Sequence, residues 1–213
     1  MNIEEVIKKT GTTTLGMVAK DGVVLATDTR VTAGYFIANT NGKKMYQLDD
    51  HVGMTIAGVV ADAQDIIDIM KYNIRSYKLE RGKPMPISAV ARLASNVFFY
   101  NRGTPLIVES LIGGFDQTGP SLYMVDFFGS ITKETVSGTG SGSPIGLGVI
   151  DGDYREGLPL DDCIRLIIRA VTAAMKRDSA TGNSFNVAVA DREGFRELTD
   201  DEKRGYLKSI QQN

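Results

Sequence analysis

The first chemistry that the sequence suggests lies at the bond between Gly11 and Thr12, which opens a Gly-Thr-Thr-Thr run just before an apolar segment. A threonine hydroxyl is a weak nucleophile and needs a base within hydrogen-bond distance. A free α-amino group, with a pKa of about 8, can be that base, but in the uncut chain the Thr12 nitrogen is an amide. Gly11 has no side chain to obstruct attack on its carbonyl. Cleavage at this bond would therefore create a nucleophile and its base together, although threonine is also common at the start of a plain β-strand.

Composition restricts the classes of protein to consider. The 213 residues are 42% hydrophobic, which is enough for a full core, and no linker-like stretch interrupts them, so one domain is expected. The net charge of -2 favours neither nucleic acid nor a membrane surface as a partner. The first residues mix Glu and Lys without the apolar core of a signal peptide, and no stretch approaches the ~20 apolar residues of a membrane span. We expect a cytoplasmic protein.

Three further features argue against cofactors and metals. Cys163 is the one cysteine and lies in a helical pattern, which predicts a small core residue. His51 is the one histidine and is expected in a surface turn, so no Cys/His ligand set for a metal exists. The glycine-rich residues 137–146 match neither form of phosphate-binding loop. The sequence predicts no metal and no cofactor.

Hydrophobic periodicity predicts strands and helices in alternating groups. Two hairpins come first, one joined at Asp21-Gly22 and one at Asp49-Asp50, with strands over residues 13–20, 23–29, 43–48 and 52–58. Later strands are predicted over residues 105–115, 121–129, 131–138, 183–191 and 195–199. Helices are predicted over 60–80, 87–101, from an N-cap at Ser143, over 160–177 and after Asp200. This order predicts an α+β fold, a four-layer α/β/β/α sandwich of two antiparallel sheets flanked by helices.

Five segments occur in the order and spacing of one known family: GTTTLGMVAKDGVVLATDTRVT, NGKKMYQLDD, GMTIAGVVADAQD, TGSGSPIGLGV and AMKRDSATG. On these segments the sequence resembles the catalytic β subunits of the archaeal-type 20S proteasome, which are amino-terminal nucleophile hydrolases of the threonine peptidase type. The resemblance runs from Gly11 almost to the carboxyl end. It implies that residues 1–11 are a propeptide removed by self-cleavage at Gly11-Thr12, and that residues 12–213 form a single peptidase domain.

The resemblance also implies roles for individual residues. Thr12 matches the nucleophile and, once its amine is free, the proton acceptor, while Asp28 and Lys44 match the acid and base beside it. A nearby ammonium stabilises an alkoxide, and a carboxylate keeps that ammonium charged and oriented. Without the family, Asp28 could belong to a polar loop and Lys44 to a solvated turn.

Further positions match supporting roles in the family. Gly58 matches the residue whose backbone N–H forms the oxyanion hole. Ser141 and Asp178 match polar residues around the threonine amine. Thr181 stands where the family commonly has serine, and because threonine keeps the hydroxyl we expect function to survive.

The resemblance implies a specificity pocket of medium-sized apolar residues. Burying an unpaired charge there would be costly, so cleavage after large apolar residues is expected. Thr32 matches the position whose backbone aligns a substrate as an added strand. The pocket positions are Val31, Ile56 and Val60, with Tyr46 and Gln64 nearby.

The implied partners are proteasome α subunits, other β subunits in a heptameric ring, a second stacked β ring, a regulatory ATPase acting through the α ring, and unfolded polypeptide substrates. Two alternatives stay open: a non-catalytic structural ring subunit, and another amidase of the amino-terminal nucleophile fold. In the uncut chain we expect the leader along the substrate cleft near Gly58, with Lys44 and Asp28 already paired beside Thr12.

Overall fold

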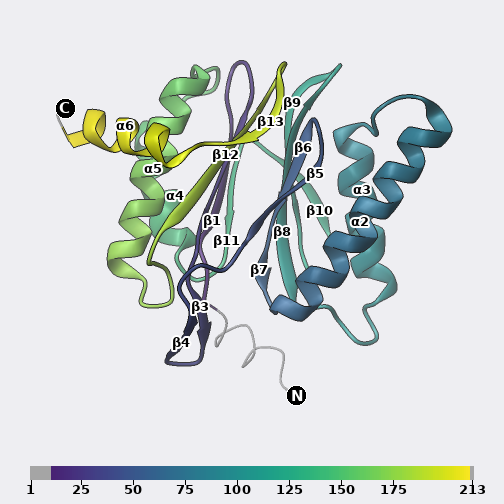
Figure 1. Ribbon diagram of the computed structural model, residues 1–213, viewed down its shortest axis with the longest axis horizontal. Coiled ribbons are helices and arrows are strands. Elements are labelled where there is room, and N and C mark those ends of the chain that lie inside the picture. Colours follow the sequence, from purple (N-terminus) through teal and green to yellow (C-terminus); the bar gives the residue numbers. More distant parts are fainter. Residues whose placement is uncertain (1–10, 212–213) are drawn as a thin grey trace.

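The computed structural model describes residues 11–211, and in it two antiparallel sheets pack face to face between helices (Figure 1). The first sheet has the strand order β11-β1-β2-β12-β13. Its central strands are the predicted hairpin around Asp21-Gly22, in which Thr14 pairs with Thr27. The strands of this sheet are β1 (Thr14–Val18), β2 (Val23–Asp28), β11 (Val136–Thr139), β12 (Phe185–Asp191) and β13 (Gly194–Glu197).

The second sheet has the order β10-β9-β8-β6-β5, and a short strand β7 pairs with β8. The predicted hairpin at Asp49-Asp50 forms β5 and β6. A separate hairpin of β3 (Val31–Ala33) and β4 (Phe36–Asn39) projects at the end of the sandwich where β1 begins (Figure 1). The other strands of the second sheet are β5 (Met45–Asp49), β6 (Val52–Thr55), β7 (Ala57–Gly58), β8 (Val108–Asp116), β9 (Gly119–Val125) and β10 (Ile131–Glu134).

Helices cover the outer face of each sheet, as expected for the four-layer sandwich (Figure 1). The helices α4 (Ser143–Asp153) and α5 (Leu160–Arg177) lie against the first sheet, and α6 (Asp200–Gln211) packs on α5. The helices α2 (Val60–Arg81) and α3 (Ile87–Tyr100) lie against the second sheet. The predicted α/β/β/α fold is confirmed. No helix within residues 11–211 combines the length and apolar character that crossing a membrane requires.

Strand alternation divides the apolar residues between the layers. Val23 and Leu25 of β2 point between the sheets, where they meet Leu111 and Leu122 from the second sheet. The intervening residues of β2 contact the core under α4 and α5. This alternation follows from the two-residue repeat of a strand. It also fixes which side chains at the strand ends face the space between the sheets.

Two predictions at the segment before α4 are wrong. Residues 131–138 were expected to form one strand, but β10 pairs with β9 and β11 pairs with β1, so the chain crosses between sheets at Thr135. The alternating pattern continues through this crossing and does not mark it. Ser143 is the first helical residue rather than the N-cap, which is Gly142, and its hydroxyl donates to the Gly140 carbonyl at 2.8 Å. The crossing brings residues 139–143 to the start of β1.

Candidate active site

The hairpin of β1 and β2 places Thr12 beside Asp28. The Asp28 backbone N–H donates to the Thr13 carbonyl at 3.1 Å, which extends the pairing of the two strands to their ends. Thr12 is 5% exposed and Asp28 is fully buried. The sequence expectation that Asp28 ends the second strand next to Thr12 agrees with this geometry.

Lys44 connects these two residues. Its Nζ atom lies 2.7 Å from Oδ1 of Asp28 and 2.9 Å from Oγ1 of Thr12. The Thr12 hydroxyl in turn donates to the carbonyl oxygen of Gly11 at 2.6 Å. Burial lowers the pKa of Lys44, and the charge of Asp28 acts in the opposite direction. The ammonium group is therefore positioned to stabilise negative charge on the Thr12 oxygen.

Backbone groups hold the Asp28 carboxylate in place. Oδ1 accepts a hydrogen bond from the Thr13 N–H at 2.9 Å. Oδ2 accepts from the N–H of Arg30 at 3.0 Å and from the N–H of Gly182 at 3.1 Å. These three hydrogen bonds fix the position and orientation of the carboxylate next to Lys44.

A second cluster of polar side chains lies around the Thr12 nitrogen. The Thr12 N–H donates to Oγ of Ser141 at 3.3 Å, and the Ser141 hydroxyl donates to Oδ2 of Asp178 at 2.6 Å. The hydroxyl of Thr181 donates to the same carboxylate oxygen. Thr181 is fully buried, and its Oγ1 also lies 2.7 Å from Oγ1 of Thr13. The structure thus brings Ser141, Asp178 and Thr181 together around Thr12.

A cavity of about 180 Å³ opens beside the Gly11-Thr12 bond. The Gly11 N–H donates to Oγ1 of Thr32 at its wall, at 3.2 Å. Gln64 lies on an exposed part of α2 and is not part of the lining. The expected course of residues 1–10 along this cleft lies outside the described residues. The predicted substrate residues that do line the cavity are Val31, Thr32, Tyr46, Ile56 and Val60.

Gly58 lies in the wall of the same cavity at the end of β7. Its φ of 142° is unfavourable for residues with a side chain. A Cβ atom here would also lie 2.1 Å from the carbonyl oxygen of Ile107. Both the backbone conformation and the Ile107 carbonyl therefore exclude a side chain at position 58.

Comparison with known proteins identifies the family. The family model described as "Proteasome subunit" matches residues 8–190. The chain belongs to the proteasome family. It is 46% identical to "Proteasome subunit beta 2" of Nitrosopumilus maritimus (strain SCM1) over 207 residues, covering 97% of this chain and 98% of that protein. It is 43% identical to "Proteasome subunit beta" of Methanosphaerula palustris over 201 residues, covering 94% and 95% of the two chains.

A third relative is "Proteasome subunit beta 1" of Pyrobaculum calidifontis, 46% identical over 189 residues, covering 88% of this chain and 94% of that protein. These matches across nearly the whole length make the chain a β subunit of the proteasome core. A core of this family is a multi-subunit assembly.

Sequence reasoning gave no role to two residues that shape the proteasome site. Thr13 contributes its N–H to Asp28 and its hydroxyl to Thr181. Arg30 donates from Nε to Oδ1 of Asn183 at 3.0 Å and from a guanidinium nitrogen to the Ser179 carbonyl at 2.6 Å, which holds the loop that carries Thr181. The only signal for Arg30 was its place two residues after Asp28.

Proposed function

We propose that this β subunit is a threonine endopeptidase that matures by cutting its own Gly11-Thr12 bond. The observation that carries the proposal is the position of the Lys44 Nζ atom between Asp28 and the Thr12 hydroxyl, with that hydroxyl on the Gly11 carbonyl. A nucleophile, a fixed cation and a peptide carbonyl are the parts that an acyl transfer needs. In the proposed domain organisation, residues 1–11 are the propeptide and residues 12–213 are the peptidase domain.

Self-cleavage begins when the Thr12 oxygen attacks the Gly11 carbonyl carbon and loses its proton. The carbonyl electron pair moves to oxygen, where the Gly58 N–H stabilises the negative charge. The bond from Gly11 carbon to Thr12 nitrogen then breaks, and the nitrogen takes up the proton that the Thr12 hydroxyl lost. This leaves an ester on the Thr12 oxygen and a free amine. Water hydrolyses the ester and releases residues 1–11 with a new carboxylate.

The mature site repeats this chemistry on a substrate peptide. The Thr12 amine accepts the hydroxyl proton, and its conjugate acid donates a proton to the leaving nitrogen. Lys44 stabilises the oxygen anion and is oriented by Asp28. Ser141, Asp178 and Thr181 hold the amine in place, since Ser141 already contacts the Thr12 nitrogen. Water then hydrolyses the acyl-enzyme ester and regenerates Thr12.

The apolar lining of the 180 Å³ cavity supports cleavage after apolar residues, because it offers the substrate side chain Val31, Ile56 and Val60. We further propose that the subunit works in the cytoplasm, in a heptameric β ring stacked on a second β ring. α subunits and an ATPase acting through the α ring would supply unfolded polypeptides.

The test is coexpression of the full chain with a candidate α subunit, followed by intact mass and native mass spectrometry. Wild type is expected to lose residues 1–11, and Thr12→Ala is expected to keep them. Wild-type particles should hydrolyse a fluorogenic apolar peptide in preference to a small amide. Loss of the leader at Gly11 in Thr12→Ala would refute self-cleavage, and inactive processed particles would indicate a structural subunit.

A further inference from the structure

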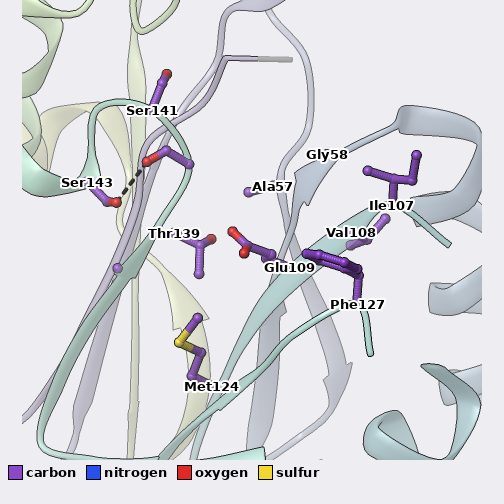
Figure 2. A pocket seen from close by; sticks show the side chains of 12 residues that line it. Ala57, Gly58, Ile107, Val108, Glu109, Met124, Phe127, Thr139, Ser141 and Ser143 are labelled. Carbon is purple, nitrogen blue, oxygen red and sulfur yellow. Dashed lines mark hydrogen bonds between the residues drawn. The ribbon is translucent and has the colours of Figure 1, made fainter. Parts of the chain in front are cut away.

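A second cavity, of about 530 Å³, lies between the two sheets next to the candidate active site (Figure 2). It shares Gly58 with the substrate cavity and includes Ser141, the residue that contacts the Thr12 nitrogen. Met124 and Phe127 form part of its apolar wall. The two cavities therefore meet at Gly58.

Glu109 places a carboxylate in this otherwise largely apolar space. It lies on β8 opposite Ala57 of β7, and its side chain points into the cavity (Figure 2). It shares a strand face with Leu111, which belongs to the core between the sheets. Within residues 11–211 the structure shows no hydrogen bond or ion pair to the Glu109 carboxylate. An acid thus occupies the mouth of the space between the sheets, and no cation from the described part of the chain pairs with it.

Burial raises the pKa of Glu109, and the nearby charge of Asp126 raises it further. Both effects disfavour the ionised carboxylate. A positively charged group bound there would remove this cost by pairing with the carboxylate. The chemistry of the cavity is therefore complementary to a cation on an aliphatic chain.

The contacts of the Gly11-Thr12 bond show on which side of the reaction the second cavity lies. The chain before the bond is directed toward Thr32, which accepts from the Gly11 N–H. The Thr12 nitrogen, on the other side of the bond, is directed toward Ser141. A substrate whose acyl part fills the first cavity would continue past Gly58 into the second.

We propose that the second cavity binds the first two residues after the scissile bond, and that Glu109 selects a lysine or arginine side chain among them. This inference rests on the proposed peptidase function. Glu109 is then a specificity residue for the leaving-group side of the substrate, distinct from the apolar selection on the acyl side.

The test uses assembled, processed particles and internally quenched peptides that share one apolar acyl half. The peptides carry Lys, Gln or Glu at the first or the second position after the scissile bond. Each kcat/KM is divided by that for a fluorogenic arylamide with the same acyl half, which has no residues after the bond. The variants are Glu109→Gln and the matched control Glu197→Gln, which changes an exposed residue on β13.

Wild type and Glu197→Gln are expected to prefer Lys over Gln by roughly 1.5-fold to fivefold at one of the two positions, the range for a partly exposed ion pair. Glu109→Gln should lose this preference, and Glu109→Lys should shift it to Glu. Equal cleavage of all peptides by active wild type would overturn the inference and leave the peptidase function standing. Failure to cleave both peptides and arylamide would overturn the peptidase function and the inference with it.

Discussion

Gly11 packs so closely against Ala180 that a Cβ atom at position 11 would lie 1.8 Å from the Ala180 Cβ. The same atom would lie 3.2 Å from Oγ of Ser141. No side chain fits there without a shift of the backbone or of the loop after α5. The glycine before Thr12 is therefore required by packing as well as by access to its carbonyl carbon.

Replacement of Gly11 by Ala is expected to slow self-cleavage by roughly a hundredfold, because the Gly11 carbonyl must move relative to the Thr12 hydroxyl. The double variant Gly11→Ala with Ala180→Gly removes the opposing Cβ and should recover part of the rate. The measurement is a time course of intact mass after mixing with α subunits. Gly148→Ala, on an open part of α4, is the control. Processing of Gly11→Ala at the wild-type rate would contradict the packing argument.

Substitutions of the two adjacent lysines, Lys43 and Lys44, are expected to have very different effects on kcat. Lys44 is 6% exposed and contacts both Thr12 and Asp28, whereas Lys43 is exposed and lies over the Tyr46 ring at 5.3 Å. Lys44→Ala should lower kcat by roughly 10²- to 10³-fold, the range for loss of one group that stabilises negative charge in the transition state. Lys43→Ala should change kcat little. The kcat of each variant is measured with a fluorogenic apolar peptide as the substrate. Native mass spectrometry checks that both variants assemble.

An active Lys44→Ala particle would remove the basis of the catalytic assignment. A misfolded variant is separated from a catalytic defect by its failure to enter the ring. Asp28 keeps its three backbone hydrogen bonds when Lys44 is shortened, so the local fold has support without the ammonium group.

The sequence was sufficient for the parts of the site that depend on local patterns. Asp21-Gly22 predicted the hairpin that brings Asp28 next to Thr12, and the structure has that pairing. The long amphipathic helices and the four layers also followed from periodicity. In each case the pattern lies within a short stretch of sequence.

The parts that were not predicted depend on contacts between distant segments. The crossing at Thr135 has no local signal, because residues on both sides of it keep a strand pattern. Gly11 packs against Ala180, and the hydroxyl groups of Thr13 and Thr181 form a hydrogen bond. Both contacts join the segment before β1 to the loop after α5, which lies far away in the sequence. The β3–β4 hairpin was missed because its exposed residues have no core face to create an alternating pattern.

Substitutions of Thr181 test whether the cluster of polar side chains around the Thr12 nitrogen needs the Thr181 hydroxyl. Thr181→Ser keeps the hydroxyl that contacts Asp178 and Thr13, so activity and stability should stay close to wild type. Thr181→Val keeps the shape but leaves the Thr13 hydroxyl without this partner. We expect the valine variant to lose about 1–3 kcal/mol of unfolding free energy. Thermal unfolding and peptidase assays check both effects, and equal behaviour of the two variants would show that the hydroxyl is dispensable.

Cys163 is expected to be chemically inert in the folded subunit. Its side chain is fully buried in the core between the first sheet and α5, and burial raises the pKa of the thiol to about 11 from an ordinary value of 9.0. Since the thiolate is the reactive form, iodoacetamide at about pH 8.5 should modify Cys163 only after denaturation. Mass spectrometry of native and guanidinium-treated samples measures this.

The same pKa shift predicts the sign of a stability change at alkaline pH. The unfolded thiol loses its proton near pH 9.0, whereas the folded thiol keeps it until about pH 11. Because the folded pKa is the higher one, the contribution of Cys163 to stability is complete below pH 9.0 and declines as the pH rises toward 11. Cys163→Ala lacks this titration, so the stability difference between wild type and the variant should shift in favour of the variant over that range. A difference that stays constant with pH, together with rapid native alkylation, would show that the thiol is accessible and ionises normally.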